Sequence, residues 1–95
     1  MAVTVLIRRK VATGKDELLE NLYRELIAQA MTQQGYIGAE TMKRADLPDE
    51  YLVISKWETV EDWSRWLISE TRRSYQERID ALTDSETKFE IYEHT

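Results

Sequence analysis

Three tryptophans within ten positions are the side chains best able to shape a binding site. Trp57 ends an apolar run, and Trp63 and Trp66 follow at helical spacing. Indole rings bury a large apolar area and can stack on an aromatic ligand. Trp63 shares a helical face with Val60 and Leu67, which favours a place in the core, and Trp57 is expected to close that core. Trp66 is displaced around the helix, so it either joins the core or lines a gap between helix and sheet.

Two tyrosines and two basic runs are further candidates for a site. Tyr23 and Tyr75 each combine an apolar body with a polar tip, which suits either a core or a pocket wall, and the core is the favoured interpretation. The run Arg8 to Lys10 lies in the first predicted strand and should divide between its two faces. The pair Arg72 and Arg73 is expected on a solvated helical surface rather than at an anion site.

Signatures of several enzyme classes are absent from the sequence. It contains one histidine and no cysteine, which leaves no thiolate or multi-histidine metal site. It has no glycine-rich phosphate loop and no nucleophile elbow. His94 lies next to the last residue, where a frayed and solvated side chain is expected. We therefore expect neither metal nor nucleotide catalysis.

The composition predicts one globular domain over residues 1–95. No stretch rich in Pro, Gly or Ser divides the chain, and 42% hydrophobic with 33% charged residues is typical of a soluble protein. The net charge of -5 offers no basic field to phosphates, which argues against a nucleic-acid partner. No apolar run approaches the length of about 20 residues that a membrane-spanning helix needs. The absence of cysteine fits a cytoplasmic location.

Hydrophobic periodicity predicts the elements that position these side chains. Val3, Val5 and Ile7 alternate with their neighbours in a way typical of a strand. Apolar residues from Leu18 to Met31 recur at helical spacing. Further strands are predicted over residues 36–44, 51–57 and 88–92, and further helical segments from residue 60 and, as a shorter piece, around Tyr75, Ile79 and Leu82.

Local signals indicate where these elements begin and end. Thr13 and Thr59 are predicted helix N-caps, each followed three residues later by an aspartate, and Gly35 is the predicted C-cap of the first helix. Along the strand over 36–44, strict alternation places Ile37, Ala39 and Thr41 on one face and Tyr36, Gly38, Glu40 and Met42 on the other.

The order strand, helix, strand, strand, helix, strand predicts an α+β, ferredoxin-like βαββαβ fold with a four-stranded antiparallel sheet. Helices in such a fold cover one face of the sheet. The strand over 51–57 is nevertheless apolar on both faces, at Tyr51, Leu52, Val53 and Ile54. Because something must cover the second face, a homodimer that pairs its sheet faces is the expected assembly.

The segment from Trp57 to Ser69 resembles the antibiotic biosynthesis monooxygenase (ABM) family. Members of that family place Trp-Glu, an acidic helix start and then Trp-Leu-x-Ser, as in Trp57-Glu58 and Trp66-Leu67-Ile68-Ser69. The turn at Thr13-Gly14 and the pair Gly35-Tyr36 agree with the same plan. The resemblance implies a single ABM-like domain that forms a dimeric α+β barrel, with a pocket in each protomer between sheet and helices.

The resemblance also implies a cofactor-independent monooxygenase that oxidises a small aromatic or quinol-like substrate with O2. The substrate itself then donates the electrons, and the pocket supplies desolvation, orientation and a proton acceptor. On this plan the pocket is lined by Ile7, Tyr23, Trp66 and Gln76. Trp66 would stack on the substrate, Gln76 would hydrogen-bond a substrate oxygen, and Tyr75 would relay a proton.

Two alternatives stay open at this point. The domain could be a non-catalytic binding module or a stress-associated dimer, because fold does not imply function and no acid-base set is evident. The heme-degrading branch of the family is a weaker match. Of its pocket residues only Trp66 is retained, whereas Ile7 replaces an asparagine and Gln76 replaces the heme-ligating histidine.

Overall fold

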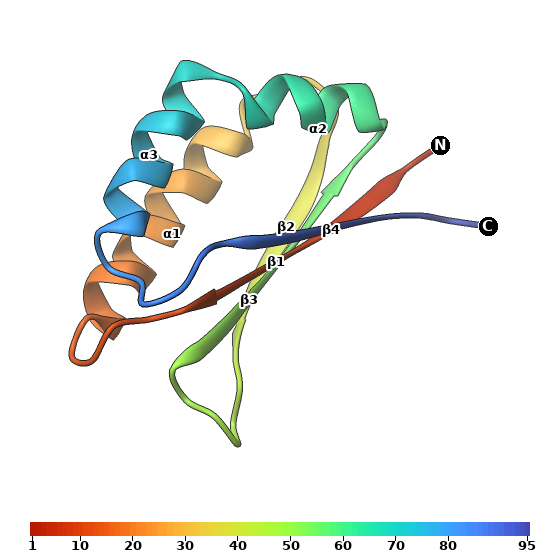
Figure 1. Ribbon diagram of the computed structural model, residues 1–95. Coiled ribbons are helices and arrows are strands. Elements are labelled where there is room, and N and C mark those ends of the chain that lie inside the picture. The colour runs from red at the N-terminus through yellow and green to blue at the C-terminus, as the bar shows by residue number, and fades with distance from the viewer.

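The computed structural model describes all residues 1–95 and has the predicted order of elements. These are β1 (Val3–Lys10), α1 (Asp16–Ala30), β2 (Tyr36–Lys43), β3 (Glu50–Trp57), α2 (Val60–Leu67), α3 (Glu70–Asp80) and β4 (Lys88–Glu93). The helices cover one face of the sheet and leave the other bare, and both chain termini lie at the same end of the molecule (Figure 1). None of the helices is long and apolar enough to cross a membrane. The α+β, ferredoxin-like βαββαβ fold is thereby confirmed.

The four strands form one antiparallel sheet in the order β2-β3-β1-β4. Opposed residues of neighbouring strands share a face, and Val5 is opposed by Ser55 on one side and Ile91 on the other. The alternate residues Val3, Val5, Ile7 and Arg9 of β1 consequently all point to the helices, and all four are buried. The core is built on this row.

The tryptophans occupy the places predicted for the core. Trp57 and Trp63 are completely buried and meet edge to face, with ring centroids 6.2 Å apart. Tyr36 approaches Trp57 in the same way at 5.6 Å. Leu19 of α1 and Ile79 of α3 close the layer from the helical side. Burying an apolar side chain of this size stabilises the fold by about 2 to 3 kcal/mol, so this cluster is a main source of stability.

The predicted alternation of β2 is wrong at its first residue. Tyr36 is opposed by Trp57, and the next opposed pair is Gly38 with Lys56, so Ile37 is the extra residue of a β-bulge. The bulge turns Tyr36 to the helical face, where Ala39 also points. Ile37 is left half exposed.

One of the two predicted N-caps is confirmed. The backbone N–H of Asp62 donates to the hydroxyl of Thr59 at 3.1 Å, and that hydroxyl donates to the Asp62 carboxylate at 2.9 Å. The prediction for Thr13 is wrong, because α1 begins at Asp16 and is preceded by Lys15, which makes no side-chain cap. Thr13 lies instead in the turn that joins β1 to α1.

Gly35 is not the C-cap of α1, which ends at Ala30. It lies in the turn before β2 with φ of 82°, a left-handed conformation that favours glycine. Its carbonyl accepts the N–H of Glu58 at 2.7 Å, and a Cβ at this position would overlap the carboxylate of Asp62. Gly35 therefore permits the close approach of this turn to the first turn of α2.

Replacing Gly35 by alanine tests this packing. We expect Gly35→Ala to lower the free energy of unfolding by about 2 kcal/mol or more, because left-handed strain adds to the overlap with Asp62. Gly14→Ala is the matched control, since Gly14 has a φ of 78° but no neighbour within 4 Å of the added Cβ. It should lose only about 1 kcal/mol in urea unfolding. Equal losses in the two variants would show that the close approach to Asp62 does not add to the cost of an alanine at position 35.

A candidate ligand-binding site between the helices and the sheet

A small cavity lies between the helices and the sheet. Its volume is about 30 Å³, which holds one or two water-sized groups. Three of the four residues predicted to line the pocket, Ile7, Tyr23 and Trp66, are in its wall. These side chains come from β1, α1 and α2, which are brought together only by the packing of helices on sheet.

Trp66 fulfils both roles that its helical position allowed. It is buried, and its ring stacks on Trp57 with centroids 6.2 Å apart and an interplanar angle of 26°. It also forms part of the cavity wall, as does Trp63. Two adjacent indoles therefore offer an apolar, aromatic wall to a ligand.

Arg9 is a cavity residue that was not among the predicted site residues. Its place in the inward row of β1 buries it to 3% exposure. The guanidinium donates to Gln76 Oε1 at 2.9 Å, to Thr87 Oγ1 at 3.2 Å and to Tyr23 Oη at 3.4 Å. The strand alternation does place Arg9 with Ile7, so the signal that could have found it was present in the sequence.

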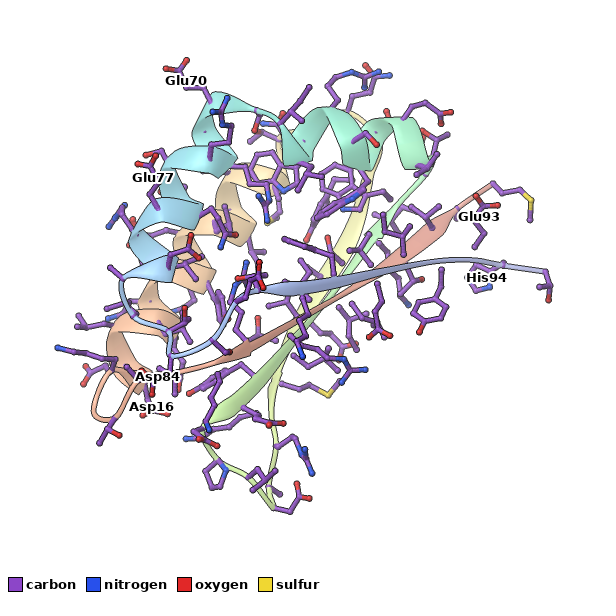
Figure 2. The ribbon with its side chains drawn as sticks, in the orientation of Figure 1. Asp16, Glu70, Glu77, Asp84, Glu93 and His94 are labelled. Atoms are coloured by element: carbon purple, nitrogen blue, oxygen red, sulfur yellow. The ribbon has the colours of Figure 1, made fainter.

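The prediction that both Arg72 and Arg73 lie on a solvated helical surface is wrong for Arg72. Arg73 is exposed as expected, but Arg72 is only 5% exposed and lines the cavity. Ser69 caps α3 by accepting the Arg72 N–H at 3.2 Å. The guanidinium lies over the rings of Trp63, at 5.8 Å, and Phe89, at 5.3 Å. Glu70 and Glu77 point away from the sheet on the outer side of α3 (Figure 2).

The environment of Arg72 opposes its positive charge. Burial first, and then the charge of Arg9, lower the pKa of Arg72 to about 10, whereas Asp80 acts in the opposite direction. Because this pKa is well above 7, the guanidinium remains charged at neutral pH. The cavity wall therefore carries two buried positive charges.

Gln76 joins these two guanidinium groups from outside the cavity wall. Its Oε1 accepts from Arg9 at 2.9 Å and from Arg72 at 3.1 Å. Its Nε2 donates to Asp80 at 2.7 Å and to Thr87 at 3.1 Å. The amide is thus engaged on both sides and fixes the orientation of both arginines.

Tyr75 and His94 lie apart from the cavity. The hydroxyl of Tyr75 donates to Glu25 at 3.4 Å, and Arg78 covers its ring at 5.2 Å. His94 is exposed beyond the end of β4, at the opposite end of the sheet from the turn that precedes α1 (Figure 2). The predicted solvated position of His94 is therefore confirmed.

The hydrogen-bonding groups around the cavity are mainly donors. Trp63 Nε1 is the single buried side-chain nitrogen or oxygen without a partner. Ser55 Oγ accepts from Trp57 at 2.8 Å, which leaves its own proton free to donate. Burial raises the pKa of Tyr23 despite the opposing charge of Arg9, so its phenol stays protonated at neutral pH and cannot act as a base there.

Removing the buried charge of Arg72 tests its contribution to stability. We expect Arg72→Met to leave the free energy of unfolding unchanged or to raise it by about 1 kcal/mol, because an apolar chain of similar length avoids the desolvation of a cation without a carboxylate partner. Arg73→Met, on the exposed side of the same helix, should change it by less than about 0.5 kcal/mol. Urea unfolding measures both. A loss above about 2 kcal/mol in Arg72→Met would make the guanidinium a structural anchor instead.

Solved structures share this fold closely. A conserved protein from Methanosarcina mazei Go1 is 19% identical with a TM-score of 0.94, and the match covers 100% of this chain and 94% of that one. SnoaB from Streptomyces nogalater, described as a cofactor-independent oxygenase, is 18% identical with a TM-score of 0.89 and coverage of 99% and 93%. Rv0793 from Mycobacterium tuberculosis is 14% identical with a TM-score of 0.89 and coverage of 100% and 96%. At these identities the likeness establishes the fold.

Comparison of sequences establishes the family as well as the fold. A search of curated proteins finds no match to the chain. The sequence model of the antibiotic biosynthesis monooxygenase family, in contrast, matches residues 2–78, which is most of the chain. The chain therefore belongs to the antibiotic biosynthesis monooxygenase family.

Proposed function

We propose that this protein is a monooxygenase that oxidises a small hydrophobic, aromatic or quinol-like substrate with O2 and without a cofactor. Membership of the family and the fold shared with SnoaB, a cofactor-independent oxygenase, support the reaction class. The observation that carries the proposal is the buried cavity with two indoles in its wall and a row of hydrogen-bond donors around it. Such a wall suits a flat ring that carries oxygen.

The proposed reaction balances without an external reductant. A CH2 group next to a phenolic ring loses a proton, and the resulting carbanion supplies electrons to O2. One oxygen atom becomes the new carbonyl, and the other leaves with the two hydrogens of the CH2 group as water. Desolvation and orientation by the cavity, together with stabilisation of developing negative charge, are what the protein contributes.

Within this proposal, the predicted residues take different parts. Trp66 stacks on the substrate ring, and Ile7 and Tyr23 shape the cavity. Direct contact of Gln76 with a substrate oxygen stays a prediction, and Gln76 also acts through the arginines that it holds. The relay role of Tyr75 stays a prediction as well, and would require its hydroxyl to leave Glu25.

Entry of an aromatic ring requires side chains to move, because the cavity of about 30 Å³ is smaller than a ring. A groove of about 270 Å³ next to α1 shares Tyr23 and Ile27 with the cavity. Displacement of these two side chains would join the groove and the cavity. The small volume of the cavity is also the observation that favours the second candidate, a non-catalytic binding module.

A heme-degrading activity has the least support. The Gln76 amide, at the position of the ligating histidine, is held by four hydrogen bonds and is a poor ligand for iron. A macrocycle would also need far more space than the cavity provides.

The bare face of the sheet supports the proposal of a homodimer. Leu6, Leu52 and Ile54 point to this face from the two central strands, and Met42 extends the apolar surface onto β2. No helix covers these side chains (Figure 1). Pairing of this face with a second copy would remove the apolar area from water and is proposed here as the assembly.

Oxygen uptake tests the enzymatic proposal. Purified protein without added metal or flavin should consume O2 with at least one member of a panel of quinols, anthrone-like phenols and naphthols, at a rate above the blank without protein. Trp66→Ala should lower kcat/KM about fivefold, because a stacking partner worth about 1 kcal/mol is lost. Ile68→Ala, at a 70% exposed position that follows α2, is the control and should keep the rate. No uptake across the panel would favour the binding module.

The mass in solution tests the dimer. We expect twice the chain mass at micromolar concentration by light scattering. Ile54→Glu should yield the monomer mass, because it places a charge in the centre of the bare face. Ile68→Glu, which adds the same charge at an exposed position outside the sheet, should remain dimeric. A monomer in the unchanged protein would contradict the proposal.

A further inference from the structure

The two buried arginines lack the partners that buried cations normally have. Arg9 and Arg72 are 3% and 5% exposed, yet all six ion pairs of the molecule involve other residues. Both guanidinium groups use the same neutral acceptor, Gln76 Oε1. Buried charges are generally paired with a carboxylate or another ion. The cavity wall is therefore short of negative charge.

The other polar groups of the cavity add to this imbalance. Trp63 Nε1 has no acceptor at all, and the hydroxyl protons of Ser55 and Tyr23 are not used by any protein acceptor. A ligand that completes this set must bring acceptors and negative charge. An ammonium or another cation would face two like charges, those of Arg9 and Arg72.

We propose that the cavity binds the oxyanion of an aromatic ligand between Arg9 and Arg72, with the ring against Trp63 and Trp66. The proposal rests on the monooxygenase function and assigns two residues of this chain, Arg9 and Arg72, to hold the oxygen of a phenolic substrate as an anion. The volume of about 30 Å³ fits one oxygen or a carboxylate group. The ring then requires the displacement of Tyr23 and Ile27 toward the neighbouring groove.

Two charged side chains line the cavity, whereas Asp80, Asp84 and Glu86 lie with Arg72 around a separate, more open pocket. Arg9 faces the cavity from β1, Arg72 from α3 and the neutral phenol of Tyr23 from α1. The nearby carboxylate of Asp80 is held by the Gln76 amide at 2.7 Å, on the far side of that amide from the guanidinium groups. The β3 and α2 walls contribute Ser55 and the two indoles, which carry no charge. The positive charges are thus not cancelled within the wall.

Binding of a phenol at this position releases its hydroxyl proton to water and leaves the oxygen as an anion. Two fixed cations in a desolvated site stabilise that anion far more than water-exposed cations would. The protein then needs no buried base for this first deprotonation. This explains how the site can operate although Tyr23 is a donor and no carboxylate or imidazole lines the cavity.

A spectroscopic titration of bound 1-naphthol tests the inference without any turnover. Naphtholate absorbs at longer wavelength than naphthol and than tryptophan, so its fraction can be read directly under anaerobic conditions. We expect the bound naphthol to ionise at least one pH unit below free naphthol, which corresponds to about tenfold tighter binding of the anion. A second arm compares 1-naphthoate with its methyl ester, and the carboxylate should bind at least tenfold more tightly.

Matched variants assign the effect to the buried charge. Arg72→Gln should move the naphthol ionisation back toward that of free naphthol by at least about 0.5 pH unit and weaken the preference for naphthoate, with the remaining shift due to Arg9. Arg73→Gln makes the same charge change at an exposed position of the same helix and should behave as the unchanged protein. If Arg72→Gln does not fold, the naphthol ionisation and the comparison of naphthoate with its ester in the unchanged protein still show whether the cavity binds an anion.

The outcomes separate this inference from the proposed function. A preference for naphthoate alone would keep the anion site but assign it to a carboxylate. Naphthol that ionises at or above its free value, together with naphthoate that binds no more tightly than its ester, would overturn the inference. Oxygen uptake together with that result would support the monooxygenase function without the anion site. A lowered ionisation of bound naphthol without oxygen uptake would support the anion site and contradict the monooxygenase function.

Discussion

The central position of β1 in the sheet is the constraint on which the rest of the structure depends. Its backbone is paired with β3 along its whole length and with β4 from Val3 to Arg8, and this pairing fixes its register. The period of two then sends every second side chain beneath the helices. Val3, Val5 and Ile7 supply the floor of the core, and the same alternation carries Arg9 into the interior behind them. One geometric rule thus builds the core and brings a charge into it.

Burying two cations is a stability cost that the fold limits in specific ways. The guanidinium of Arg72 lies over two aromatic faces, and the Gln76 oxygen accepts a hydrogen bond from each arginine. These contacts orient the groups but leave their charge unneutralised. Burial without a counter-charge lowers the pKa of Arg72, and a perturbed pKa beside a cavity marks a candidate functional position.

The family and fold describe the scaffold more closely than the chemistry. Structures that are 14 to 19% identical reproduce this chain with TM-scores of 0.89 to 0.94, so the packing of helices on a four-stranded sheet tolerates extensive sequence change. Much of that scaffold was predictable from the sequence because its signals are local. Alternation gave the strands, apolar spacing gave the helices, and Thr59 marked the start of α2. Predictions failed where a tertiary contact overrides local preference, as at the Ile37 bulge and at Gly35, which is required by Asp62 rather than by α1.

The sequence by itself determined the order of the elements, the bare apolar face of the sheet and the aromatic character of the cavity wall. Trp66, Ile7 and Tyr23 could be assigned to that wall chiefly through the family resemblance, because periodicity favoured the core for Tyr23 and left Trp66 open between core and gap. Alternation along β1 also indicates that Arg9 shares the inward face with Ile7, but only the tertiary structure decided that Arg72 is buried. Arg72 and Arg73 are indistinguishable as neighbours in a basic pair, and the one that turns inward is selected by the rings of Trp63 and Phe89. Those rings come from α2 and β4, so their contact with Arg72 depends on how separate elements pack, which no local pattern contains.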